Sequence, residues 1–303
     1  AKTKDIENPV LWLPDYFCNQ STLPARDAGA QLIFYPIGPD LEPNWTACDT
    51  LAKMGKPDLF VLVHYFGKPA DGEKARSFCD KVEASLIEDA AHVLGPIDDI
   101  GRYGDFIFYS PYKTFPVPDG AVLLVRDTSV ATSISQITPS LPYNAPSPWA
   151  WRMKRILQKI LPTSVLEKRA RARQPNFNDD PPLMPLAPTP RLSQVARRML
   201  SHQGDKNFKI ATARKSNANA LRAKTMESPE GRPLFEAVHE GAGPYRFPML
   251  YSDQERATGL FNFLSAKGCP VETWPDLPPE VTANPAIHAE AIKLRTTIVF
   301  FPV

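Results

Sequence analysis

Short apolar runs that alternate with polar, helix-like segments dominate the first half of this chain. Runs rich in β-forming residues occupy 10–13, 30–37, 58–66 and 85–90. Strands that are separated by roughly 12 to 15 helical residues are typical of βαβ units with parallel strands. Two further runs, 105–110 and 121–127, are joined by a proline-bearing turn, which favours antiparallel pairing. The sequence therefore predicts an α/β fold with a mostly parallel, mixed sheet.

The middle of the chain is rich in proline. Residues 139–190 include PPLMPLAPTP, which predicts an extended connection, because proline has a fixed φ and no backbone N–H. Inside it, residues 151–161 have a helical pattern with Lys154, Arg155 and Lys159 away from the apolar face. The apolar face carries Ile156, Leu157, Ile160 and Leu161. Two interpretations stay open: a solvated helix that covers the core, or a helix that docks on an anionic membrane or acidic ligand.

A second, smaller unit is predicted at the C-terminal end. A long helical pattern starts at Arg191 and leads to strand-like residues 245–252, a helix over 253–268 that stops at Gly268, and a β-type run at 270–274. We therefore divide the chain into a large domain (1–135), a proline-rich connection with a basic helix (136–190), and a long helix with a small α+β domain (191–303).

Composition excludes several classes of function. The 35 basic and 33 acidic residues leave a net charge of +2, so no global field favours nucleic acid. The four cysteines are far apart and form no CxxC pair, which argues against a metal site and for reduced thiols in the cytoplasm. No apolar run approaches the ~18 residues of a membrane span. Both ends of the chain lie in or near apolar runs, which predicts an N-terminally incomplete protein.

Polar side chains follow three of the predicted strands. His64 and Tyr65 end one run, and Glu88 and Asp89 end the next, with His92 beyond them. Ligands of parallel α/β sheets bind beyond the carboxyl ends of the strands. We therefore expect a ligand site at this edge of the sheet.

Lys113 is the candidate nucleophile. It follows the run 105–110 and lies among Pro111, Tyr112 and Phe115. Apolar neighbours desolvate an amine, which lowers its pKa and makes the neutral, nucleophilic form available for Schiff-base chemistry. Alternatively, Lys113 is an exposed residue of a turn.

Three stretches together resemble a known family. They are VHYFGKPAD (63–71), IEDAAHVLG (87–95) and GRYGDFIFYSPYKTFPVPDGAVLL (101–124), in which Asp89 precedes a Ser-x-x-Lys ending at Lys113. This succession is similar to the DegT/DnrJ/EryC1/StrS aminotransferases, which are fold-type-I pyridoxal phosphate enzymes. The resemblance implies a three-layer fold, pyridoxal 5'-phosphate as cofactor, and amino transfer from an amino acid such as glutamate to a nucleotide-linked keto sugar. It also implies a homodimer with the site at the subunit boundary.

The resemblance assigns roles to individual residues. Lys113 would carry the cofactor as a Schiff base, and Asp89 would meet the protonated pyridine nitrogen. His92 would lie near the phenolic oxygen and Ser110 near the phosphate, with Phe17 or Tyr16 stacked on the ring. As alternatives, Asp89 caps a following helix, His92 and Ser110 are structural, and the two aromatic residues belong to the core.

Two departures from the family pattern keep rival functions open. The family's glycine- and threonine-bearing phosphate segment has no counterpart, and Ser110 stands three residues before Lys113 where five is usual. One rival is a sugar dehydratase that uses the same cofactor, against which Lys113 argues, because such enzymes have histidine there. The other is a degenerate protein of this fold with a binding or scaffold role.

Overall fold

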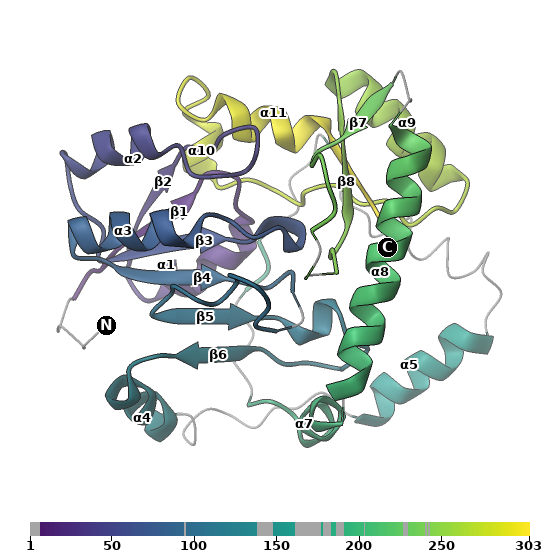
Figure 1. Cartoon of the computed structure of the whole chain (residues 1–303), viewed down its shortest axis with the longest axis horizontal. Coiled ribbons are helices and arrows are strands. Elements are labelled where there is room, and N and C mark those ends of the chain that lie inside the picture. Colours follow the sequence, from purple (N-terminus) through teal and green to yellow (C-terminus); the bar gives the residue numbers. More distant parts are fainter. Residues whose placement is uncertain are drawn as a thin grey trace.

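Two β-sheets organise the chain. The computed structural model describes residues 7–93, 95–137, 148–160, 177, 183–185, 191–202, 204–226, 230–239, 241 and 243–303. A six-stranded sheet has the order β2-β1-β3-β4-β5-β6, and a three-stranded sheet has the order β7-β8-β9. Figure 1 shows the second sheet beside the first, with the long helix α8 running along it.

The larger sheet is built as the sequence predicts. Its strands are β1 (Val10–Pro14), β2 (Gln31–Tyr35), β3 (Leu59–Val63), β4 (Ser85–Asp89), β5 (Phe106–Tyr109) and β6 (Val122–Val125). Strands β1 to β5 are parallel and β6 is antiparallel to β5. The nearly continuous apolar sequence of β1 and β3 matches their burial, because central parallel strands are covered on both faces. The predicted mixed, mostly parallel α/β sheet is confirmed.

Helices α2 (Trp45–Ala52) and α3 (Gly72–Val82) cover one face of this sheet. Trp45 of α2 and Phe78 of α3 both pack on Phe60 of β3. Asp71 caps α3 by accepting a hydrogen bond from the backbone of Lys74, and Glu83 ends the helix in the left-handed conformation. The sequence pattern predicted α3 but not α2.

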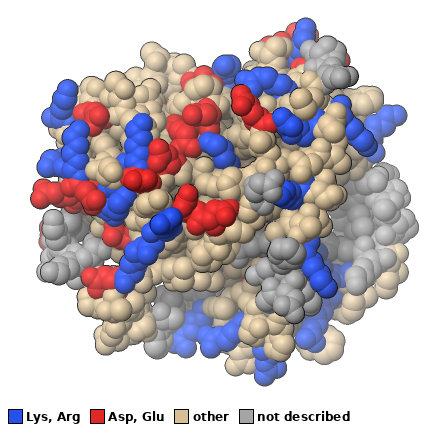
Figure 2. Space-filling model, viewed as in Figure 1, with Lys and Arg blue, Asp and Glu red and all other residues tan. Residues whose placement is uncertain are grey.

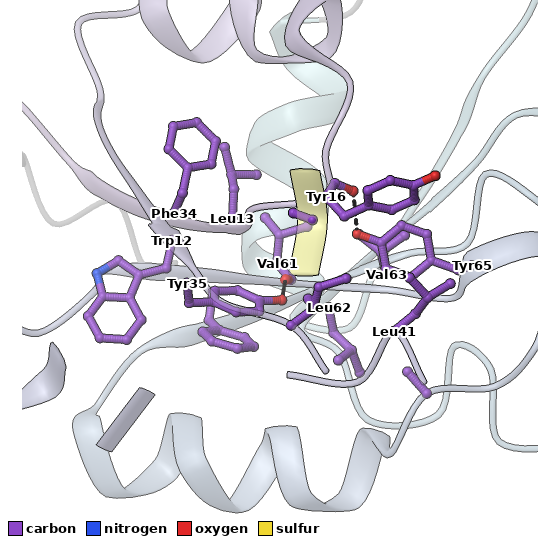
Figure 3. Packing of buried hydrophobic residues seen from close by; sticks show 14 of the residues in the cluster. Trp12, Leu13, Tyr16, Phe34, Tyr35, Leu41, Val61, Leu62, Val63 and Tyr65 are labelled. Carbon is purple, nitrogen blue, oxygen red and sulfur yellow. Dashed lines mark hydrogen bonds between the residues drawn. The ribbon is translucent and has the colours of Figure 1, made fainter. Parts of the chain in front are cut away.

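The core of the larger sheet is rich in aromatic rings. Tyr35 and Phe60 stack with their centroids 4.7 Å apart, and the Tyr35 hydroxyl donates to the carbonyl of Val61 (2.6 Å). Figure 3 shows this hydrogen bond and a second one, from the Tyr65 hydroxyl to the carbonyl of Tyr16. Because these hydroxyls have partners inside the core, the rings can be buried without leaving polar groups unsatisfied there.

The smaller sheet is antiparallel and comes from the second half of the chain. Its strands are β7 (Gly231–Pro233), β8 (Phe247–Tyr251) and β9 (Ile298–Phe301), with α9 (Gln254–Ala266) between the last two in sequence. Asp253 caps α9, and Gly268 follows its end at φ 84°, as the sequence predicts. The run 270–274, which we assign to the small α+β unit, contributes an isolated bridge from Glu272 to Phe300 of β9.

The remaining elements correct several boundaries. They are α1 (Leu23–Asp27), α4 (Thr128–Ile137), α5 (Pro148–Ile160), α7 (Gln194–Ser201), α8 (Gly204–Thr225), α10 (Pro279–Thr282) and α11 (Ala289–Thr297). The long pattern from Arg191 is therefore two helices, and α5 begins three residues earlier than predicted. Leu161, which we placed on the apolar face of that helix, lies outside the described residues. No described helix is long and apolar enough to cross a membrane.

The last part of the chain returns to the larger sheet. Trp274, Leu277, Val281 and Leu294 belong to the same buried cluster as the strands of that sheet. Asp15, after β1, and His288, before α11, are bonded to each other at 2.9 Å while both are buried. The segment that precedes β9 is therefore anchored to the N-terminal strands by apolar contact and by a buried polar pair.

Candidate active site

Three parallel strands bring their carboxyl ends to one edge of the larger sheet. Val63 of β3 is paired with Asp89 of β4, and Asp89 is paired with Phe108 of β5. Beyond the strand ends the contacts continue, since the backbone N–H of His64 donates to the carbonyl of Asp89 (3.0 Å). The polar residues that follow these strands therefore share one edge, as the sequence predicts.

Glu88 is completely buried on the face of β4 opposite to Asp89. Its carboxylate accepts hydrogen bonds from His64 Nε2 (2.8 Å) and from the backbone N–H groups of Gly101, Tyr103 and Gly104. His64 Nδ1 accepts the N–H of Ala70 (3.0 Å), so the ring proton is on Nε2, which donates to Glu88.

Glu88 holds the loop that leads into β5. Burial by itself would raise the pKa of Glu88, but the hydrogen bonds from His64 and the loop backbone outweigh it, and the pKa is lowered. The carboxylate is thus ionised and fully paired. The two adjacent acids of the IEDAAH stretch have separate surroundings, with Glu88 buttressing the fold and Asp89 facing the site.

We expect Glu88→Ala to destabilise the fold by about 3 to 5 kcal/mol at pH 7, because four donors lose their buried acceptor. Urea unfolding followed by circular dichroism measures the change. The control is Glu236→Ala, an exposed position, where a change within about 0.5 kcal/mol is expected.

The pH dependence of the unfolding free energy tests the same hydrogen bonds of Glu88. A lowered pKa in the folded state adds stability above the unfolded carboxyl pKa of about 4.3, and this stability is lost as the pH falls through the folded value. The difference between wild type and Glu88→Ala should therefore shrink in acid. A constant difference between pH 7 and pH 3 would contradict the assignment.

Asp89 ends β4 and is half-buried. Its Oδ1 accepts the N–H of Ala91 (2.9 Å), which closes a turn over residues 90–93. No helix follows Asp89 in the described residues before β5, so the alternative that Asp89 caps a helix was wrong. The turn holds one carboxylate oxygen in place, and the second oxygen remains for a ligand.

Lys113 closes a single 3-10 turn, Pro111–Lys113, after β5. Burial lowers the pKa of its amine and Arg246 adds to this effect, while Asp89 and Cys18 oppose it. The amine nitrogen lies 5.8 Å from the ring centroid of Tyr245. Lys113 thus faces the same compartment as Asp89, and its environment favours the neutral amine that a nucleophile requires.

His92 is held in a ring stack. Its imidazole lies between Phe66 (centroids 5.7 Å apart) and Tyr245 (4.7 Å), and its Nδ1 accepts the N–H of Phe66 (3.0 Å). Burial, with the charges of Lys113 and Arg246, lowers the pKa of His92 well below its usual value. The ring is therefore neutral, with its proton on Nε2 as a hydrogen-bond donor.

Three residues of the second half join the site without any signal in the sequence. Tyr245 stacks on His92, and the guanidinium of Arg246 lies 4.2 Å from the Tyr245 ring centroid while it forms two hydrogen bonds to Glu272 (2.8 and 2.9 Å). Arg214 of α8 lies near both, since Arg246 and Tyr245 influence its pKa, which burial lowers. Only the folding of the small sheet onto the strand ends brings these side chains in.

The other predicted residues take different positions. Tyr16 is completely buried, with its ring stacked on Trp274 at 4.4 Å, which fits the core alternative. Phe17 and Ser110 are both half-buried, and the Ser110 carbonyl accepts the N–H of Lys113 (3.0 Å). Of the two aromatic candidates, Phe17 is the one with a surface left for a ligand.

The site thus combines a desolvated amine, a carboxylate, a neutral imidazole donor and an excess of cations. Within the described part of the chain, no three residues with metal-binding side chains gather at one point. A flat, anionic, carbonyl-bearing ring would find a partner for each of its polar groups here. Together with the mixed sheet, this arrangement resembles that of the fold-type-I pyridoxal phosphate enzymes.

Comparison with known proteins supports this resemblance and names a family that part of the chain matches. Residues 56–140 match the model of the DegT/DnrJ/EryC1/StrS aminotransferase family, which confirms the resemblance. A serine hydroxymethyltransferase from Methanocella arvoryzae is 34% identical over 83 residues, which are 25% of this chain and 20% of that protein. This match therefore spans only a fifth of the relative's length.

Solved structures show the same fold over nearly the whole chain. A DegT DnrJ EryC1 StrS aminotransferase from Brucella abortus has a TM-score of 0.70 at 16% identity, covering 98% of this chain and 75% of its own. Helicobacter pylori PseC, an aminotransferase of pseudoaminic acid biosynthesis, has 0.70 at 14%, covering 100% and 76%. The E. coli GDP-4-keto-6-deoxy-D-mannose-3-dehydratase with bound hydrated pyridoxal phosphate has 0.70 at 12%, covering 100% and 77%.

Proposed function

We propose that this protein is a pyridoxal-phosphate-dependent aminotransferase that moves an amino group from an amino acid such as glutamate to a nucleotide-linked keto sugar. The observation that carries this proposal is the convergence of Lys113, Asp89 and His92 at one edge of the sheet, where burial lowers the pKa of Lys113 and of His92. The sugar acceptor is supported by two structural relatives: one is a putative sugar aminotransferase from Streptococcus pneumoniae, and the other, DesI, was solved in the presence of its TDP-sugar product.

The residues present fit the cofactor. Lys113 would bind its aldehyde carbon, Asp89 the pyridine N–H, and His92 Nε2–H the phenolic oxygen. Ser110 would donate to the phosphate, and Phe17 would lie against the ring. When bound, the cofactor supplies an electron-accepting ring that stabilises negative charge on the substrate's α-carbon.

The chain's own groups then move the proton. As a free amine with a lowered pKa, Lys113 would take the α-proton of the donor. Asp89 would hold the N–H of the cofactor's ring, and the neutral His92 would donate to its phenolic oxygen without adding charge. The aromatic walls of Phe66 and Tyr245 exclude water from this edge.

A cofactor titration tests the proposal. Pyridoxal phosphate added to the protein should give a visible absorption band, and borohydride should fix the cofactor on Lys113. Glutamate should then convert the band to that of the pyridoxamine form. Absence of any band would favour the scaffold alternative, and a band that glutamate leaves unchanged would favour elimination, as in the dehydratase relative.

We further assign Arg214 to the carboxylate of the amino donor. Its Nη1 is buried and has no hydrogen-bond partner among the described residues, and its Nη2 reaches only the Thr114 carbonyl at 3.5 Å. Arg246 is already engaged by Glu272, so Arg214 is the cation of the pair that is available to an anion.

We expect Arg214→Gln to raise the KM for glutamate about 10- to 100-fold and to change kcat much less, because a charge-assisted bond of about 1.5 to 3 kcal/mol is lost. Steady-state kinetics with varied glutamate measure this, and Arg222→Gln on the same helix is the control. Weaker cofactor binding with an unchanged KM would instead point to the phosphate and contradict the assignment.

The homodimer, with the site at its subunit boundary, and the cytoplasmic location are part of the same proposal. The four cysteines Cys18, Cys48, Cys79 and Cys269 are free, which supports a reducing compartment. Light scattering of the purified protein tests the dimer: a monomer that is active at assay concentration would contradict a shared site.

A further inference from the structure

Helix α5 (Pro148–Ile160) presents an apolar face that the described structure leaves uncovered. Its large apolar side chains are Trp149 (72% exposed), Met153 (46%), Ile156 (47%), Leu157 (46%) and Ile160 (72%). At about 100° per residue these five side chains fall within an arc of about 100°. A continuous apolar stripe of this kind on an exposed helix marks an interaction surface.

Positive charge borders this stripe. Arg152 falls next to one edge of the arc, and Arg155 lies farther round the helix, with its guanidinium 5.6 Å from the Trp151 ring centroid. Residues 148–173 contain eight lysines and arginines and one glutamate, whereas the whole chain has a net charge of only +2. The positive charge is thus concentrated in and just after α5.

The placement of α5 leaves it accessible. Figure 1 shows it at the lower right, away from the six-stranded sheet. In the same view, Figure 2 shows lysines and arginines without acidic residues along the lower edge of the molecule, where α7 carries the exposed Arg197 and Arg198. An anionic surface approaching this edge would meet no acidic side chains of described residues on the face shown.

We propose that α5 docks on the surface of an anionic lipid bilayer. The apolar stripe enters the boundary between headgroups and acyl chains, and Arg152 contacts the anionic headgroups at its border. Trp149, at the first turn, is the residue type that favours the membrane interface. The charge pattern favours lipid over a second copy of α5, because two such helices would bring their basic borders together. This inference does not depend on the enzymatic proposal.

Vesicle sedimentation tests the inference with the whole protein. It should sediment with vesicles of phosphatidylcholine and phosphatidylglycerol but not with phosphatidylcholine alone, and added salt should release it. Tryptophan emission should shift to the blue on binding, and Trp149→Phe should remove most of that shift. Equal binding to both kinds of vesicle, or binding to neither, would overturn the proposal.

Matched variants separate the apolar and the charged contributions. Ile156→Asp should lower vesicle partitioning at least about tenfold, and Arg152→Gln about fivefold. The controls are Ile287→Asp, 62% exposed before α11, and Arg232→Gln, which removes one exposed positive charge elsewhere; both should bind as wild type.

If a second copy of the chain covers the stripe instead of lipid, a different result is expected. If Ile156→Asp turns a dimer into a monomer in light scattering while wild type ignores anionic vesicles, the stripe is a protein interface and the lipid proposal fails. Circular dichroism melting checks that each variant remains folded.

Discussion

Lys113→Ala is expected to lose all borohydride-fixable cofactor and to slow amino transfer by about 10⁴-fold or more, about 5.5 kcal/mol of barrier. The substitution removes the only amine that the structure places beside Asp89 and His92 among the described residues, and this amine serves both as nucleophile and as base. Mass spectrometry after borohydride treatment, with single-turnover kinetics using glutamate, measures both losses.

Two further variants sharpen this test. Lys113→Arg keeps the positive charge and much of the volume, but it provides no neutral amine, so it should be as inactive as Lys113→Ala. Lys53→Ala removes an exposed lysine at the end of α2. It should leave both the fixed cofactor and the rate of amino transfer unchanged. A Lys113→Ala protein that still fixes cofactor on another lysine and turns over would refute the assignment.

Asp89→Asn is expected to slow the reaction with glutamate by about 10³-fold, about 4 kcal/mol, while the protein still fixes cofactor on Lys113. Asparagine retains the oxygen that accepts the Ala91 N–H, so the turn after β4 should survive. It lacks the negative charge that keeps the ring nitrogen protonated, so the electron-accepting power of the ring falls.

Comparing cofactor binding with the reaction rate of Asp89→Asn distinguishes the proposed role of Asp89 at the cofactor from a structural role. A structural role for Asp89 would lower the melting temperature and the cofactor content together, whereas the proposed role lowers only the rate. Asp99→Asn, in the exposed loop before β5, is the matched control. A fast Asp89→Asn enzyme would show that some other group holds the ring nitrogen.

Local patterns predicted most of the larger sheet. The runs at β1, β2, β4 and β5 are apolar and flanked by polar segments, and each forms a strand within one or two residues of the predicted bounds. Helix α2 was missed because its eight residues, from Trp45 to Ala52, have no extended apolar period. The run 58–66, which forms β3 (Leu59–Val63), was predicted too long, because Phe66 adopts a positive φ that no local pattern signals.

The site was predicted only in part, because local patterns show the residues at the strand ends but not the contacts between distant segments. Asp89, Lys113 and His92 follow strands that are neighbours both in sequence and in the sheet, so their convergence could be inferred. The burial of Tyr16 in place of Phe17 depends on stacking with Trp274, which is far away in the sequence. The donors that surround Glu88 come from a loop whose path the sequence pattern does not encode.

By itself, the sequence determined the order of the strands in the larger sheet, the residues at the strand ends and the basic, amphipathic nature of α5, because each depends on the spacing of neighbouring residues. Only the tertiary structure decided that Tyr245 and Arg246 reach Lys113, that Arg214 lies near these two residues, that the C-terminal segment returns to the larger sheet, and that the stripe on α5 stays exposed. These contacts join residues that are far apart in the chain, and they form only when the two sheets pack together.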